Sequence, residues 1–276
     1  MPPQIQKPAR RPFFAVALGG GGARGMAHIG VLKILEREGL RPDLVVGTSV
    51  GALIGAIYCA GVPIREIEEV ARKVRWGDVG SFAWRLTGFS SNMKMERWLE
   101  SFMPTRHFTD LKIPLAVCAT DLSTGNNVEI LQGDLFQAVR ASCALPGLYE
   151  PVKVDGLLLA DGGMVAYIPA PQARALGADV VLASDVRSET ALPKPPHNAY
   201  EVLIQAFSIV TYRASEKHLA AADVVVAPDL KGIGWDEMGK AGVAMVAGEF
   251  AMKAKVEELR QKLKPGLWQK VKKAMR

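Results

Sequence analysis

Residues 13–25 read FFAVALGGGGARG, in which a short apolar run leads into four glycines. An apolar run of this length bounded by glycine is typical of a buried strand, and the glycines predict a tight turn into a helix. Comparable runs recur along the chain. Most are continuous rather than alternating, as in strands buried on both faces of a parallel sheet. Strands are expected over 13–18, 44–47, 114–120, 128–131, 157–161, 180–185 and 224–228.

Stretches of helical length separate these strands. Asn198 and Glu201 resemble a capping box and predict a helix to about residue 221. Its apolar part, VLIQAFSIV, is typical of a helix that is buried or that faces a partner or lipid. The alternation predicts an α/β fold, a three-layer helix–sheet–helix sandwich with a mostly parallel central sheet. Helices are expected over 25–38, 50–60, 63–74, 93–103, 134–142, 169–176, 198–221 and 235–263.

Composition and charge indicate a globular protein with basic ends. Of the 276 residues, 49% are hydrophobic and 22% are charged, and no apolar run approaches the roughly 20 residues of a membrane span. The net charge of +6 is concentrated at the ends, since residues 252–276 carry nine Lys or Arg against two Asp or Glu. We expect a basic extension over 1–12, one domain over 13–263 and a basic amphipathic tail over 264–276.

The basic ends favour an anionic surface as partner, or are simply solvated charges. We expect reversible contact of the C-terminal tail with anionic phospholipid, no nucleic-acid partner, and a cytoplasmic protein that is at most peripheral at the inner membrane. Arg10 and Arg11 precede the first apolar run as in a twin-arginine export signal. That run of about six residues is shorter than the roughly 7–15 of such a signal, so a first core strand explains it better.

The cysteines and histidines show neither disulfide nor metal-site spacing. Cys59, Cys118 and Cys143 are odd in number, widely separated and surrounded by apolar or small residues. This pattern predicts buried free thiols in a reducing compartment. The four histidines are scattered and form no HExxH motif, so neither a metal nor another cofactor is expected.

A G-x-S-x-G motif, GTSVG, follows the strand expected over 44–47 and precedes a helix. This is the context of a nucleophile elbow, in which the serine, here Ser49, occupies a strained turn between strand and helix. Small residues at Gly47 and Gly51 avoid clashes around that turn. The serine hydroxyl then projects above the sheet, together with the first helical N–H groups. The alternative is a Gly/Ser turn that serves tight packing alone.

A serine nucleophile needs a base, and Asp161 is the best candidate. It ends the apolar run LLLAD at the carboxyl end of a predicted strand, where the sites of parallel sheets gather. Gly162 and Gly163 let the backbone turn behind it, although a plain Asp-Gly-Gly turn is an alternative. His197, in a Pro-rich loop, and His218, on a helix, are weaker candidates for the base of a histidine triad.

The glycine loop has two interpretations. Gly20, Gly22 and Gly25 fit G-x-G-x-x-G, the phosphate-binding pattern of a nucleotide-dependent oxidoreductase. That fold needs an acid at the end of the second strand, whereas Asp43 precedes the strand. An acyl-transfer site would use the same bare amides as an oxyanion hole, completed by the N–H of Val50. The serine elbow that follows favours this second interpretation.

The glycine loop GGGGARG, the elbow GTSVG and the later DGG, in this order, resemble the patatin-like phospholipase family, specifically its compact bacterial members. The region from 108 to 156 resembles the family as well, and the likeness extends over roughly residues 13–185. The resemblance implies a Ser–Asp dyad without histidine, in which Ser49 is the nucleophile and Asp161 the base. It also implies calcium-independent hydrolysis of acyl esters, often of phospholipids or lysophospholipids, through an acyl-enzyme.

The resemblance assigns roles to the loop residues too. Gly20, Gly21 and Gly22 match the glycines that supply the family's oxyanion hole. Arg24 matches the basic position of the same loop, where it orients the loop or adds positive charge. A catalytically silent protein on the same fold, binding a membrane or a partner, is the non-enzyme alternative, and the intact Ser49 and Asp161 argue against it.

Two further segments bear on substrate and assembly. The stretch 76–93 is rich in aromatic residues and predicts a lid or a wall of an acyl pocket, with ordinary packing as the alternative. The apolar helix over 199–212 is compatible with an interface in a homo-oligomer. The aromatic residues of the first segment are Trp76, Phe82, Trp84 and Phe89.

Overall fold

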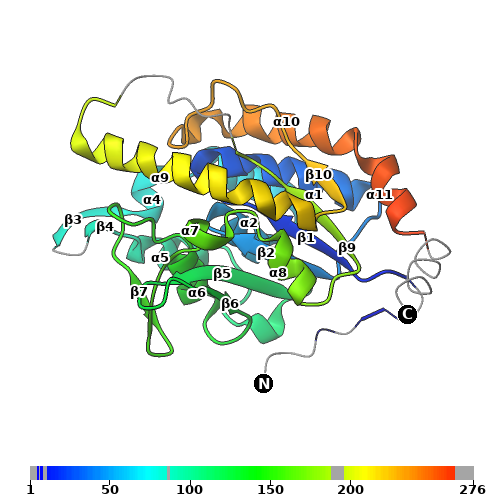
Figure 1. Ribbon diagram of the computed structural model, residues 1–276, viewed down its shortest axis with the longest axis horizontal. Coiled ribbons are helices and arrows are strands. Elements are labelled where there is room, and N and C mark those ends of the chain that lie inside the picture. The colour runs from blue at the N-terminus through cyan, green and yellow to red at the C-terminus, as the bar shows by residue number, and fades with distance from the viewer. Residues whose placement is uncertain (1–4, 6, 9–10, 86–87, 188–195, 265–276) are drawn as a thin grey trace.

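The protein is built on an eight-stranded sheet, shown in the computed structural model of Figure 1, which describes residues 5, 7–8, 11–85, 88–187 and 196–264. Five strands, in the order β10-β9-β1-β2-β5, are parallel. The other three extend the sheet with antiparallel pairing. The strands are β1 (Phe14–Leu18), β2 (Leu44–Thr48), β5 (Leu115–Asp121), β6 (Asn127–Ile130), β7 (Val152–Val154), β8 (Leu157–Asp161), β9 (Val180–Ser184) and β10 (Val224–Val226).

The antiparallel part of the sheet contains a strand, β7, that has no counterpart among the expected strands. The chain turns from β7 into β8 through Asp155 and Gly156, both of which have positive φ, 47° and 83°. Asp-Gly is favoured at such a two-residue hairpin because its turn type needs positive φ at both positions. The hairpin makes β8 antiparallel to β5, with Asp161 beside Ala119.

Alternate side chains of β1 enter two separate cores, which explains why this strand is apolar throughout. Val16 and Leu18 pack in a core with α1 (Ala27–Arg37), α2 (Val50–Cys59) and α10 (Ala241–Lys253), whereas Ala15 and Ala17 pack on the opposite face with α8 (Ala170–Ala175). Helices therefore cover both faces of the sheet (Figure 1), and the expected three-layer sandwich is confirmed.

Most helices lie where they were expected, and the main difference is in the last one. The segment expected as one helix over 235–263 is divided into η4, α10 and α11. Its start is not helical because the Trp235 carbonyl accepts a hydrogen bond from the N–H of Ala23, at 2.7 Å, in the glycine loop. The helices are η1 (Gly22–Met26), α1 (Ala27–Arg37), α2 (Val50–Cys59), α3 (Ile64–Lys73), α5 (Met93–Glu100), η2 (Phe108–Asp110), α6 (Leu135–Ser142), α7 (Gly163–Ala166), α8 (Ala170–Ala175), α9 (Ala199–Ser215), η3 (Glu216–Ala221), η4 (Met238–Lys240), α10 (Ala241–Lys253) and α11 (Val256–Lys262).

The aromatic segment 76–93 is more ordered in its backbone than a plain loop. It forms a short helix, α4 (Trp76–Val79), and an antiparallel hairpin of β3 (Ser81–Arg85) and β4 (Gly88–Ser91). The side chains of three of its four aromatic residues lie outside the described residues, as do residues 1–4, 6 and 9–10 of the basic extension and residues 265–276 of the basic tail. The three aromatic residues whose side chains are not described are Phe82, Trp84 and Phe89.

The three cysteines are buried and unpaired, as the sequence predicts. Burial raises the pKa of each thiol, so all three are protonated at neutral pH and act as apolar packing groups. None of the helices in the described ranges combines the length and the hydropathy that crossing a membrane requires.

Candidate active site

Ser49 occupies a strained turn between β2 and α2. Its backbone has φ 54° and ψ −124°, a conformation that non-glycine residues rarely adopt. Close contacts exclude a side chain at both flanking glycines, Gly47 and Gly51. A Cβ on Gly47 would lie 2.6 Å from the Ala52 backbone, and one on Gly51 would lie 2.2 Å from the carbonyl oxygen of Leu18. This backbone geometry is the one that a nucleophile elbow requires.

Replacing Gly51 with alanine is expected to destabilise the protein by more than about 3 kcal/mol or to prevent folding, because the Leu18 carbonyl belongs to the buried strand β1 and cannot retreat. The free energy of unfolding, measured by chemical denaturation, checks this. Gly239→Ala is the matched control, since a Cβ there would meet nothing within 4 Å. Equal stabilities of the two variants would contradict the steric account.

The structure brings Ser49 and Asp161 into direct contact. The Ser49 hydroxyl donates a hydrogen bond to Oδ2 of Asp161 at 2.8 Å, and Oδ1 accepts from the N–H of Gly163 at 2.7 Å. Gly162 is needed because a Cβ there would lie 2.3 Å from the carbonyl oxygen of Cys118. Asp161 reaches the elbow because β8 is antiparallel to β5, not because it ends a parallel strand.

The environment of Asp161 favours a carboxyl group that exchanges protons near neutral pH. Burial raises its pKa from 3.8 to about 6, although the hydrogen bonds from Gly163 and Ser49 act in the opposite direction. Above that pH the group is ionised and can accept a proton from Ser49. Below that pH the group is protonated and cannot accept one.

The glycine loop presents some of its amides to the pocket and uses others to hold its shape. The N–H of Gly20, an expected oxyanion donor, donates to the carbonyl of Tyr167 at 2.9 Å and is therefore engaged. Within the described ranges, the amides of Gly21, Gly22 and Val50 donate to no other protein group. Gly22 must be glycine, because its φ is +58° and a Cβ would lie 2.4 Å from the Trp235 carbonyl oxygen.

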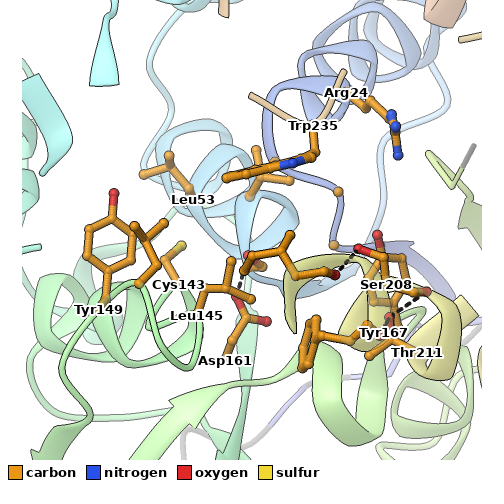
Figure 2. A pocket seen from close by; sticks show the side chains of 18 of the residues that line it. Arg24, Leu53, Cys143, Leu145, Tyr149, Asp161, Tyr167, Ser208, Thr211 and Trp235 are labelled. Atoms are coloured by element: carbon orange, nitrogen blue, oxygen red, sulfur yellow. Dashed lines mark hydrogen bonds between the residues drawn. The ribbon is translucent and has the colours of Figure 1, made fainter. Parts of the chain in front are cut away.

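Arg24 supports the loop from the side. Its Nε donates to the carbonyl of Ile233 at 2.8 Å, which joins η1 to the segment before η4. Burial lowers the pKa of its guanidinium group, while Tyr167, Asp236 and Glu237 favour the charge. In Figure 2 the guanidinium lies apart from Asp161, so its contact is with the scaffold of the loop.

Sequence reasoning missed two buried polar residues at the site. Ser142, at the end of α6, accepts a hydrogen bond from the N–H of Ser49 at 2.8 Å and donates to the carbonyl of Cys118 at 2.6 Å. His28 on α1 joins the Gly19 carbonyl, at 2.9 Å, to the Ser184 hydroxyl, at 2.8 Å. Burial lowers the pKa of His28 to about 4, so it is neutral and structural at physiological pH.

The Ser142→Ala variant is expected to lower kcat for ester hydrolysis about 10- to 100-fold, because the backbone of Ser49 loses its anchor. It also leaves the Ser49 N–H and the Cys118 carbonyl without their partner, which is expected to cost about 1–3 kcal/mol of unfolding free energy. Steady-state kinetics and denaturation measure both effects. Ser101→Ala, at an exposed residue that directly follows α5, is the control. An unchanged kcat in Ser142→Ala would refute the anchoring role.

The residues that the rival interpretations need lie elsewhere. His197 is exposed at the start of α9 and His218 is half-buried on η3, and neither lines the pocket that contains Ser49. The carboxylate of Asp43 accepts two hydrogen bonds of 2.6 Å from Arg11 and one from the N–H of Phe14 at 2.9 Å. It is thus paired at the end of the sheet where β1 and β2 begin, away from the glycine loop.

Ser49 and Asp161 lie at a pocket whose walls are mainly apolar (Figure 2). One wall comes from α4, α5 and the segment after α6, the other from α9, and Trp235 lies between them. Trp76 packs edge-on against Trp235, with ring centroids 5.8 Å apart, so this aromatic residue of the 76–93 segment does form part of a pocket wall. Prominent lining residues are Leu53, Trp98, Leu148, Ile204, Phe207 and Trp235.

Comparison with known proteins places this geometry in a family. The family model described as patatin-like phospholipase matches residues 16–174. The chain is similar to the mouse patatin-like phospholipase domain-containing protein 6, with 36% identity over 185 residues that cover 63% of this chain and 14% of that protein. It is also similar to lysophospholipase nte1 of Emericella nidulans, with 34% identity over 179 residues that cover 63% of this chain and 12% of that protein. The chain thus spans only a small part of the length of these relatives.

A solved structure shares the fold. The structure of VipD from Legionella pneumophila superposes with a TM-score of 0.59 at 14% sequence identity, covering 90% of this chain and 67% of that one. The family model spans more than half of the chain and includes the glycine loop, the elbow and the DGG motif. The chain therefore belongs to the patatin-like phospholipase family.

Proposed function

We propose that the protein is a lipid acyl hydrolase that cleaves carboxylic esters of phospholipids or lysophospholipids with a Ser–Asp dyad, without calcium or another cofactor. The observation that carries the proposal is the 2.8 Å hydrogen bond from the Ser49 hydroxyl to Asp161 at one end of an apolar pocket. A nucleophile in contact with its base, next to space for a hydrocarbon chain, suits attack on a fatty-acyl ester.

In the first half of the reaction, Ser49 Oγ attacks the ester carbonyl carbon while its proton passes to Oδ2 of Asp161. The carbonyl oxygen becomes an oxyanion, and the amides of Gly21, Gly22 and Val50 are its proposed donors. Each such donor contributes about 3–4 kcal/mol to the stabilisation of the transition state. The ester C–O bond then breaks, and protonated Asp161 returns its proton to the leaving alcohol.

In the second half, Asp161 is again ionised and takes a proton from a water molecule. The resulting attack on the acyl-enzyme releases the fatty acid and restores the Ser49 hydroxyl. A pKa of about 6 suits both halves, since the group must be a base before each attack and an acid after it.

The apolar pocket favours a substrate whose acyl part is a hydrocarbon chain. Its apolar walls would hold the chain, and the relatives are named patatin-like phospholipase and lysophospholipase. The proposal is tested by incubating the purified chain with phosphatidylcholine, lysophosphatidylcholine and a triacylglycerol, with and without EDTA, and identifying the products by mass spectrometry. Free fatty acid release that EDTA leaves unchanged is expected. Release of phosphate or of a phosphorylated headgroup in place of fatty acid would contradict an acyl hydrolase.

A further inference from the structure

Helix α9 exposes a group of large apolar side chains beside the pocket. Val202, Leu203, Ile209 and Val210 are 52%, 54%, 45% and 66% exposed, and we call this set the outer face of α9. Their spacing places them on one side of the helix over two turns, since residues three, four and seven apart share a face. Large apolar side chains grouped in this way mark an interaction surface more often than scattered ones do.

The middle of α9 also forms a wall of the pocket, and Ile209 of the outer face is one of the residues that line it. Ile204, Phe207 and Thr211 point toward the cavity that holds the dyad, and Ile204 and Thr211 are buried. At its edge, Leu203 lies next to Gly147, in the segment between Leu145 and Leu148 that lines the other side of the cavity. The apolar surface is therefore continuous from the outer face of α9 to the pocket.

The charges of α9 suit a lipid headgroup layer. Residues 202–212, VLIQAFSIVTY, contain no Lys, Arg, Asp or Glu. Arg213 follows in the last turn of α9 and Lys217 in η3, both exposed, and Arg213 forms an ion pair with Glu216 at 3.5 Å. An apolar helical face that ends in cations is typical of helices that lie in the boundary between headgroups and acyl chains.

The C-terminal end of α9 is held firmly to the sheet. Arg187, which follows β9, forms a buried ion pair with Asp185 at 2.7 Å. Its Nη1 donates to the Tyr212 carbonyl at 3.2 Å and to the Ser215 hydroxyl at 3.0 Å, and its guanidinium lies over the Tyr212 ring at 4.7 Å. The orientation of the outer face relative to the dyad is thereby fixed.

We propose that the outer face of α9 docks the protein on the surface of a phospholipid bilayer or micelle, so that an ester can pass from the lipid layer into the adjoining pocket. The purpose of docking, which is to bring an ester to the pocket, rests on the proposed function. The apolar character of the outer face of α9 does not depend on it. A second copy of the chain is a poorer fit for this face, because a specific protein interface takes about 20–30 residues a side. Four large side chains on one helix supply much less, whereas a lipid surface needs no matching shape.

The test compares two matched pairs of substitutions in the full chain. Val202→Ser/Val210→Ser removes two side chains from the outer face that do not line the pocket. Val243→Ser/Val246→Ser removes two valines, each 62% exposed, from α10, which packs on α1 and contributes nothing to the described pocket. Partition onto sedimented vesicles is measured for both, with phosphatidylcholine alone and with added phosphatidylglycerol.

The α9 pair is expected to lower the partition coefficient about tenfold or more, and the α10 pair to change it less than about twofold. Hydrolysis of a water-soluble short-chain ester is expected to stay the same in both. Equal losses in the two pairs, or unchanged partition in the α9 pair, would overturn the docking proposal. So would a wild-type dimer in sedimentation velocity that becomes monomeric in the α9 pair while vesicle binding stays unchanged.

The two proposals can fail separately. Ser49→Ala is expected to bind vesicles as the wild type does while releasing no fatty acid. Vesicle binding through α9 by a wild-type protein that hydrolyses no ester would refute the proposed function and support the docking surface. If the α9 pair hydrolyses the soluble ester normally and binds vesicles as fully as the wild type does, the docking surface is refuted and the proposed function is supported.

Discussion

Replacing Ser49 with alanine is expected to lower kcat for ester hydrolysis by about 10⁴- to 10⁶-fold, as loss of the nucleophile does in serine hydrolases. The fold should persist, because alanine removes only the hydroxyl oxygen, which donates a hydrogen bond to Asp161. Release of fatty acid is followed under saturating substrate, and circular dichroism checks the fold. A folded variant that keeps more than about a tenth of the wild-type kcat would show that another residue attacks the ester.

The Asp161→Asn variant is expected to lose activity and gain stability. An amide can keep the two hydrogen bonds, donating to Ser49 and accepting from Gly163, but it cannot take the serine proton. We expect kcat to fall about 10³-fold or more, the scale of a lost general base. In the wild type, kcat/KM should fall as the pH drops through about 6, where the base becomes protonated.

The gain in stability depends on pH in a definite direction. The pKa of Asp161 is higher in the folded protein, about 6, than its ordinary value of 3.8, so folding favours the protonated form. Below about pH 4 the burial of Asp161 does not lower the free energy of unfolding of the wild type. This free energy falls as the pH rises toward 6, and above that it is lower by the full amount of about 3 kcal/mol.

Asp161→Asn should therefore unfold at a Tm several degrees higher than the wild type at pH 8, and the difference should vanish near pH 4. Thermal unfolding at both values of pH checks this. A variant that is less stable than the wild type at pH 8 would mean that the charged form of Asp161 is favoured by folding, contrary to the buried environment described here.

The elbow and the glycine loop could be predicted because their sequence patterns are local. A strand followed by a serine turn and a helix is visible in a few residues of sequence, although the contact that excludes a side chain at Gly51 is with Leu18 in β1. The structure brings Asp161, the predicted base, into contact with Ser49, but not through the parallel strand that was expected. Asp161 meets Ser49 through an antiparallel strand, and the Asp155–Gly156 hairpin that reverses the chain was a local signal that could have been read.

The residues that hold the site in place depend on contacts between distant parts of the chain. The amide of Gly20 is engaged by the carbonyl of Tyr167, and Ser142 reaches the amide of Ser49 from a helix 93 residues later. A single serine or histidine within an apolar helix, as with Ser142 and His28, gives no sequence signal of the group it will meet. Such hydrogen-bond partners can be identified only once the order of the strands in the sheet, and with it the positions of the helices, is known.

The most direct test of the central claim, that Ser49 is a nucleophile activated by Asp161 alone, is to label the protein with a fluorophosphonate and map the adduct by peptide mass spectrometry. We predict an adduct on Ser49, formed at least about 100-fold more slowly in Asp161→Asn and at the wild-type rate in His197→Ala/His218→Ala. An adduct on another residue, or slow labelling in the histidine variant with normal labelling in Asp161→Asn, would contradict the account.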